Sequence, residues 1–367
     1  MKIYIHGNCQ APALAELLTE AMPAGTRISS RQVYSLDLIK DRAAYLREVA
    51  TADVILMQPV SENYRDVEWL SSDWVRANAK SSARVLMFPV VYHRGQLLQC
   101  FPLGEFHSGR LAYHDAHAID YFLRGQSAAE FVRDTATSSF LPAAFVNSEI
   151  LRSTLDLLKR EHGHPMDATV TDIISTSLTH GQPMQAVNHP SRQVMAEMAN
   201  RLLTKLGREE RVELEGPGIL HEFIMPPYLS TAIALDHDGV DLRMDEVGFM
   251  GAWETREAFY EAVFADYARI GAEALRKAIA WSEIPAYLAR YAEVVPLREA
   301  DQRSLVDALY DKLFGRGVLA HEALHHVRVI KRYGGYPALI EAFATTLFAV
   351  PGALGQLQKR YDPTASD

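Results

Sequence analysis

Hydrophobic positions in the first hundred residues form four short apolar runs separated by segments of helical periodicity. The runs are KIYIHG (2–7), RISSRQVYSL (27–36), ADVILMQPV (52–60) and ARVLMFPVVYH (83–93). The third and fourth are almost unbroken apolar blocks, which is typical of strands covered on both faces. Helix-like segments near 11–22, 40–51 and 67–79 alternate with the runs. This alternation predicts right-handed crossovers and a mainly parallel sheet flanked by helices, an α/β fold.

The pattern becomes mostly helical after residue 125, with helices expected near 128–135, 147–162 and 191–206. Ser191 is a suitable N-cap for the last of these helices, and Gly207 is a suitable stop. From about residue 252 onward we expect only helices and turns, over 254–280, 284–294, 301–314, 317–332 and 336–348. The sequence therefore predicts an α/β catalytic domain over residues 1–245 and an all-helical C-terminal domain or extension over 246–367.

Composition is that of an ordinary soluble globular protein, with 48% hydrophobic and 23% charged residues. The net charge of −9 argues against a nucleic-acid partner held by a broad basic surface. No early segment resembles a secretory signal, and the most apolar late stretch, 338–355, is interrupted by Glu341 and Pro351, so no membrane span is expected. Two cysteines, Cys9 and Cys100, cannot form a disulfide framework, and a cytoplasmic location is expected.

Cys9 lies at a strand-to-helix turn, in the stretch GNCQ at residues 7–10. A cysteine at a helix N-terminus faces the positive end of the helix dipole, which is expected to lower the pKa of the thiol. The N–H groups of the same turn are suited to hold a developing oxyanion. Gly7 permits a tight turn, and Asn8 and Gln10 add side-chain donors. The alternative is a small buried residue that fills the joint between strand and helix.

A thiol nucleophile usually needs a base, and His189 in NHPS, directly before a predicted helix, is the best placed of 14 histidines. The layout resembles that of SGNH-class serine hydrolases, whose flavodoxin-like sheet carries a nucleophile in GDS and a base in DxxHP. GNC and AVNHPS are the matching segments here, and Ala186 stands where the orienting aspartate would be. Asn188 and Asp172 are candidates for that third role. The alternative for His189 is a capping residue in a loop.

Four scattered motifs together resemble the WcbI family of polysaccharide-biosynthesis proteins, which are linked to capsule formation. The motifs are GNCQA, QPV, an FP segment that leads into an aromatic, His and Asp stretch, and a late NHPS, within roughly residues 1–230. The resemblance implies binding of coenzyme A, with acetyl-CoA as acyl donor, and acetyl transfer to a capsular sugar. It implies site roles for Cys9, Gln10, Gln58 and His189.

Coenzyme A would require cations for its phosphates, and arginine is suited to that task. Arg94 and Arg110 follow the fourth apolar run, and Arg192 begins the helix after His189. His107, close to Arg110 in the sequence, is a further candidate for binding the cofactor.

Two histidine-rich segments compete with this site. LGEFHSGRLAYHD departs from the Tyr-His-Pro-Asp run of the family, so the roles of His107, His114 and Asp115 stay open. With His117 they could form a metal cluster, but a polar rim is expected. The segment HEALHH places His321, Glu322 and His325 in the formal zincin spacing, but no third-ligand motif follows, and we expect a solvated helix face. No metal is therefore expected.

We expect a cytoplasmic acyltransferase that uses coenzyme A thioesters and modifies a free, nucleotide-linked or lipid-linked saccharide. Attack by a Cys9 thiolate and direct base catalysis by His189 both remain open. Residues expected around the oxyanion and substrate are Asn8, Gln10, Gln58 and Asn188. One alternative is a cysteine-nucleophile esterase or deacylase of SGNH-like architecture. Another is a non-catalytic acyl-CoA-binding or assembly protein whose C-terminal helices dock onto a second copy or a biosynthetic partner.

Overall fold

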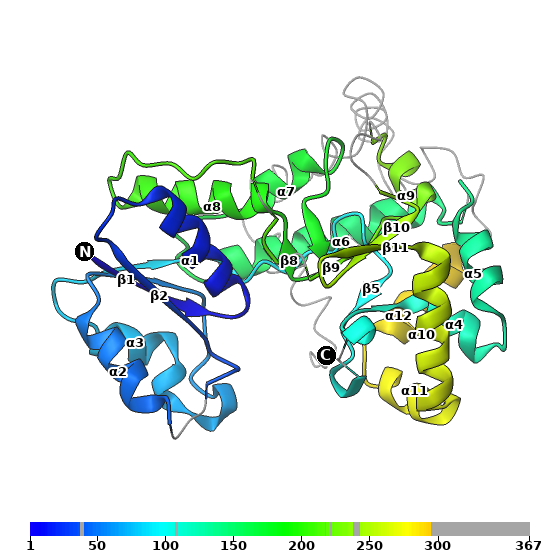
Figure 1. Ribbon diagram of the computed structural model, residues 1–367, viewed down its shortest axis with the longest axis horizontal. Helices are drawn as coiled ribbons and strands as arrows, with labels where there is room; N and C mark the ends of the chain where they lie inside the picture. The colour runs from blue at the N-terminus through cyan, green and yellow to red at the C-terminus, as the bar shows by residue number, and fades with distance from the viewer. Residues whose placement is uncertain are drawn as a thin grey trace, which may run out of the picture.

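The computed structural model describes residues 1–294, with gaps at 37–39, 107–108, 139, 217, 221 and 238–242. Figure 1 shows two lobes side by side, the first around the N-terminal sheet and the second around the later helices and short strands. Separate hydrophobic clusters fill them, since the residues buried around the sheet differ from those buried among the later helices.

A four-stranded parallel sheet forms the centre of the first lobe, in the order β2-β1-β3-β4. Its strands are β1 Lys2–Gly7, β2 Arg27–Gln32, β3 Val54–Met57 and β4 Arg84–Met87. β1 pairs with both β2 and β3, so the carboxyl ends of these strands meet at one edge. The predicted mainly parallel sheet flanked by helices is therefore confirmed.

Side chains of β1 alternate between two layers of helices, as the pleat of a strand requires. Ile3 and Ile5 pack with residues of α1 (Gln10–Ala21) and α8 (Arg192–Lys205). Tyr4 points to the opposite face and packs with residues of α2 (Arg42–Thr51) and α3 (Ser72–Asn78). Figure 1 shows these pairs of helices on opposite sides of the sheet.

The boundaries predicted for the helix at 191–206 agree closely with those of α8. The Ser191 hydroxyl accepts a hydrogen bond from the Val194 backbone N–H, and Gly207 has a φ of +66° just beyond the helix end. The other helices of the middle region are α4 Ala116–Leu123, α5 Ala128–Thr135, α6 Ala143–His162, α7 Thr171–Ser177 and α9 Leu229–Ala234. α4 lies before residue 125 and was not expected. Its first turn is capped by the Asp115 carboxylate.

Short antiparallel strands accompany these helices. They are β5 Cys100–Phe101 with β6 His114–Asp115, β7 Met184–Ala186 with β8 His189–Pro190, and β9 Phe223–Ile224 with β10 Glu246–Phe249 and β11 Ala252–Thr255. Single-turn 3-10 helices are η1 Tyr64–Asp66, η2 Glu68–Leu70, η3 Gly104–Phe106 and η4 Gly109–Leu111. Segments this short carry too little periodicity to be read from a sequence.

The C-terminal helical region begins later than the sequence pattern predicts. Residues 252–255 form a strand, so the helical prediction is wrong there, and Gly271 with a φ of +87° divides the expected helix 254–280. The helices observed are α10 Arg256–Ile270, α11 Ala272–Ile279 and α12 Ile284–Val294. They share one hydrophobic cluster with residues of 97–151.

A domain boundary after residue 245 stays a prediction, and the helices expected after 301 lie outside the described residues. Within the described part of the chain, no helix is long and apolar enough to cross a membrane.

Candidate functional site

Cys9 occupies the N-cap position of α1, in the turn that follows β1, as the sequence predicts, but its side chain makes no capping hydrogen bond. Asn8 does this instead: its side-chain Oδ1 accepts from the Gln10 backbone N–H at 2.9 Å, and its carbonyl accepts from the Ala11 N–H at 3.0 Å. The cap is therefore supplied by the neighbouring residue, and the thiol has no part in holding the helix end.

Gln58 supports this turn from the end of β3. Its Oε1 accepts from the Asn8 backbone N–H at 2.8 Å, and its Nε2 donates to Gln10 Oε1 at 2.8 Å and to the Pro89 carbonyl at 3.2 Å. A side chain at Gly7 would put a Cβ only 2.6 Å from Gln58 Oε1. Gly7 is therefore required by this close approach rather than by an unusual backbone conformation.

Gln10 extends the same hydrogen-bond network to the segments around Val91 and Asn188. Its Nε2 donates to the Val91 carbonyl at 2.6 Å and to the Asn188 carbonyl at 2.9 Å, and its Oε1 also accepts from the Val91 N–H at 3.1 Å. Both glutamines are buried. Because their amide groups bond within the protein, Gln10 and Gln58 position the turn around Cys9 rather than reach a substrate.

Asn188, between β7 and β8, contacts the Cys9 sulfur. Its Nδ2 lies 3.8 Å from Cys9 Sγ, within reach of a weak N–H···S contact. The Tyr113 hydroxyl donates to Asn188 Oδ1 at 2.5 Å and lies 3.1 Å from His189 Nε2. Cys9, Asn188, Tyr113 and His189 therefore form one connected set of side chains where the two lobes meet.

Tyr113 is a site residue that sequence reasoning missed, although it stands in the AYHD stretch beside the expected histidine and aspartate. A phenol has one hydrogen, so when Tyr113 donates to Asn188, His189 Nε2 must carry a hydrogen and donate to the Tyr113 oxygen. This places the lone pair of the neutral imidazole on Nδ1. Asp172, a candidate for orienting His189, instead pairs with Arg201 at 2.5 Å.

The thiol environment differs from the sequence-based expectation. Burial, with a smaller contribution from the Glu222 carboxylate, raises the pKa of the Cys9 thiol to about 11, because hydrogen bonds from the backbone N–H groups of Cys9 and Gln10 offset only part of the increase. The expected lowering of the pKa is therefore wrong, because loss of water around the sulfur outweighs the helix N-terminus. The N–H groups of Asn8, Gln10 and Ala11 also already donate within the protein, which reduces the donors open to an oxyanion.

Two further side chains, Tyr34 and Glu222, interact electrostatically with the Cys9 thiol or with each other. Burial raises the pKa of the Tyr34 phenol to about 12, and charges at Cys9, Tyr64 and Glu222 contribute to this shift. Tyr34 follows β2 in the first lobe, whereas Glu222 precedes β9 in the second. Both side chains are exposed. No motif in the sequence links them to the site.

The three candidate arginines are held by carboxylates from different parts of the fold. Arg94 is buried between Glu149, at 3.3 Å, and Glu283. Arg110 pairs with Glu254 of β11 at 2.6 Å. Arg192 pairs with Glu20, near the end of α1 opposite Cys9, at 2.5 Å. The structure therefore does not gather them into one cationic pocket, and His107 lies outside the described residues.

His114 and His117, the histidines near Asp115, each lie within hydrogen-bond distance of a tyrosine hydroxyl. His114 Nδ1 lies 3.1 Å from the Tyr267 hydroxyl, and His117 Nε2 lies 3.1 Å from the Tyr287 hydroxyl. Across the residues that the structure describes, no group of three or more His, Cys, Asp or Glu side chains could hold a metal ion. His321 and His325 lie outside that part of the chain.

Comparisons with known proteins agree on one family. The sequence model described as "WcbI: Polysaccharide biosynthesis enzyme WcbI" matches residues 2–211. A solved structure of WcbI, described as a novel polysaccharide biosynthesis enzyme in its native form without a disulfide bond between coenzyme A and a cysteine, has a similar fold. Its TM-score is 0.66 at 20% identity, over 79% of this chain and 98% of the other. No curated protein matches the chain.

Proposed function

Because the chain belongs to the WcbI family of polysaccharide biosynthesis enzymes, we propose that it is a cytoplasmic acyltransferase acting on a saccharide with a coenzyme A thioester as donor. The observation that carries the proposal is the connection of Cys9 to His189 through Asn188 and Tyr113. It combines a candidate base with amide and sulfur groups in one site at the carboxyl edge of a parallel sheet, where α/β proteins bind ligands.

Coenzyme A would supply an activated acyl group as a thioester. The description of the related structure refers to a disulfide between coenzyme A and a cysteine, and we place the thiol end of the molecule beside Cys9 in this chain. Arg110 is the best candidate for its phosphates, because 34% of its side chain is exposed, against 6% for Arg94 and 8% for Arg192. Phosphate binding there would exchange one anionic partner, Glu254, for another.

His189 is the proposed general base: it takes the proton of the acceptor hydroxyl as that oxygen bonds to the acyl carbon, and the proton then passes to the coenzyme A sulfur that leaves. The Tyr113 hydroxyl, 3.1 Å from His189 Nε2, holds the ring in place while the proton is transferred. With the pKa of Cys9 at about 11, only about one thiol in ten thousand is ionised at pH 7. This favours direct transfer to the sugar over a covalent acyl-Cys9 stage, with Asn188 Nδ2 orienting the groups near the sulfur.

The test is an acyl-transfer assay with acetyl-CoA and candidate saccharides, together with calorimetry of coenzyme A. His189→Gln should lower the rate of transfer by about 10²–10⁴-fold, because a general base contributes that much, and leave coenzyme A affinity nearly unchanged. Exposed His164 is a matched control, and His164→Gln should behave as wild type.

Other outcomes would replace the proposal. Hydrolysis of simple esters without coenzyme A would indicate the cysteine-nucleophile esterase. Tight coenzyme A binding without transfer to any saccharide would indicate a non-catalytic binding or assembly protein.

A further inference from the structure

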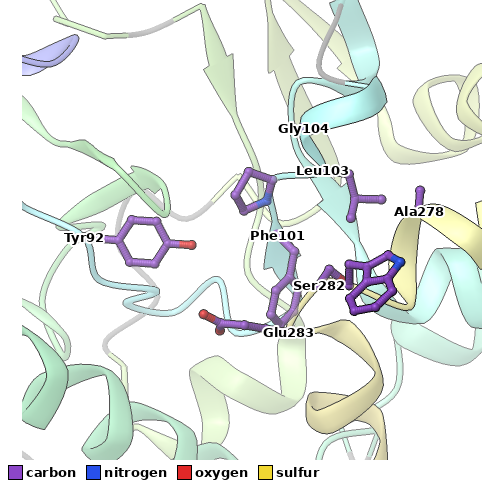
Figure 2. Close-up of a pocket in the computed structure, with 9 residues that line it drawn as sticks. Tyr92, Phe101, Leu103, Gly104, Ala278, Ser282 and Glu283 are labelled. Carbon is purple, nitrogen blue, oxygen red and sulfur yellow. The ribbon is translucent and has the colours of Figure 1, made fainter. Parts of the chain in front are cut away.

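A cavity of about 430 Å³ lies in the second lobe between the segment that follows β4 and the turn joining α11 to α12. Its size is within the range of pockets that hold small molecules, roughly 300–1,000 Å³. Figure 2 shows Tyr92 on one side with its hydroxyl directed toward Phe101, and Glu283 below them. Neither Cys9 nor His189 lines this cavity.

Three aromatic residues, Tyr92, Phe101 and Trp281, are among those that line the cavity. Trp281 has 92% of its surface exposed, an unusual state for so large an apolar side chain. Phe101 is buried, and the Arg94 guanidinium carbon lies 4.2 Å from the centre of its ring. Trp281 and Tyr92 therefore offer aromatic surface and one phenolic hydroxyl.

Glu283 is the single charged residue among those that line the cavity. It pairs with Arg94, which also bonds to Glu149, and 70% of the Glu283 side chain stays exposed. Its carboxylate is therefore fixed in direction and still reaches the cavity. An ionised carboxylate only accepts hydrogen bonds, so it selects ligands that donate them.

The cavity and the Cys9 site share two segments of chain. Val91 bonds through both its N–H and its carbonyl to Gln10, and the next residue, Tyr92, lines the cavity. Phe101 pairs in β5–β6 with His114, the neighbour of Tyr113. A ligand held in the cavity would thus lie against the same framework that positions Cys9 and His189.

We propose that this cavity binds a pyranose ring of the saccharide acceptor. A sugar ring presents an apolar C–H face, suited to the Trp281 indole, and a rim of hydroxyl donors, suited to Glu283 and Tyr92. Coenzyme A fits less well, because its phosphates would be repelled by the Glu283 carboxylate. The inference rests on the proposed function for the identity of the acceptor, while the cavity's chemistry alone selects a neutral, hydroxyl-rich ligand.

The experiment uses the full chain and a panel of neutral hexose oligosaccharides of two to six units, screened by saturation-transfer NMR and titrated by calorimetry. Wild type should bind at least one member. Trp281→Ala should weaken that binding at least about tenfold, because an aromatic anchor typically contributes this much or more. Glu283→Gln, which leaves Arg94 its Glu149 partner, should weaken it by a smaller factor. Coenzyme A affinity should stay the same in both variants.

Ile233→Ala is the matched control, since Ile233 is another exposed apolar residue, on α9, and it should bind sugars as wild type does. Equal sugar binding in wild type and Trp281→Ala, or no binding of any oligosaccharide by wild type, overturns the proposal. Loss of coenzyme A affinity in Trp281→Ala would assign the cavity to coenzyme A and also overturn it. Trp281-dependent sugar binding without acyl transfer would leave this site standing while the proposed function fails.

Discussion

The side-chain amides of Gln10 and Gln58 are joined by a buried hydrogen bond of 2.8 Å from Gln58 Nε2 to Gln10 Oε1. It links the first turn of α1 to the end of β3, 48 residues further along the chain. Through their remaining atoms the two amides also hold Asn8 on one side and Asn188 on the other. The position of Cys9 therefore depends on two residues that need not touch a ligand.

Gln58→Leu should destabilise the protein strongly. The Asn8 N–H would lose the Gln58 acceptor, and the Pro89 carbonyl would lose the Gln58 donor, whereas Gln10 Oε1 would keep its bond from the Val91 N–H. A buried polar group that loses its partner costs roughly 1–3 kcal/mol. The free energy of unfolding in urea should fall by at least about 2 kcal/mol. Exposed Gln193 on α8 provides the control, and Gln193→Leu should change it by less than about 0.5 kcal/mol. Unchanged stability in Gln58→Leu would contradict the network.

Alkylation of Cys9 should be slow at neutral pH and should accelerate as the pH rises. The thiolate is the reacting form, and with a pKa of about 11 its population increases about tenfold per pH unit between pH 7 and 10. Cys100 is fully buried, burial raises its pKa to about 12, and it should react later than Cys9 in folded protein. Mass spectrometry of iodoacetamide-treated samples measures both rates. A plateau in Cys9 labelling near pH 7 would show that the thiol is ionised instead.

Tyr113→Phe should lower acyl transfer without preventing folding, because the ring that packs near Phe223 is kept. The variant lacks the hydroxyl that orients Asn188 Oδ1 and His189 Nε2, and small errors in orientation of a catalytic group cost up to about a hundredfold in rate. Steady-state assays should show a lower kcat with coenzyme A affinity unchanged. Tyr121→Phe removes the hydroxyl of another tyrosine, which donates to the Asp134 carboxylate, and should retain full activity. A Tyr113→Phe enzyme with wild-type kcat would exclude this role.

Asp115 should make stability depend on pH in an unusual direction. Burial raises the pKa of its carboxyl from 3.8 to about 6, although hydrogen bonds from Tyr228 and Tyr260 partly offset this. The folded state binds the Asp115 proton more tightly than the unfolded state does. The stabilisation that this provides is therefore fully present below about pH 4 and is lost as the pH rises through 6. It amounts to about 3 kcal/mol at most.

Asp115→Asn, which has no charge to titrate, isolates the effect. As the pH rises from 4 to 7, the unfolding free energy of the wild type should fall relative to that of Asp115→Asn. Comparing the two proteins cancels the buried histidines His6 and His93, whose pKa values are lowered by burial and whose contributions run the opposite way. A difference that stays constant with pH would mean that Asp115 titrates normally.

The local pattern of hydrophobic and polar residues was sufficient to predict the parallel sheet and several of the helices. Unbroken apolar blocks such as Val54–Met57 form strands because both faces are covered, and Ser191 starts α8 because its hydroxyl satisfies a helix N–H. Residues 252–255 are different. They pair with β10 as a hairpin, so their conformation depends on a partner strand rather than on their own periodicity.

By itself, the sequence determined that Cys9 would stand between a strand and a helix and that His189 would stand just before another helix, since both follow from short-range backbone preferences. Only the tertiary structure decided what surrounds them. Tyr113 and Asn188 reach the site from segments about 100 and 180 residues away from Cys9, and the burial they create reverses the expected direction of the thiol pKa. Desolvation and ion pairing, such as that of Arg192 with Glu20, are properties of packed neighbours, which no local pattern specifies.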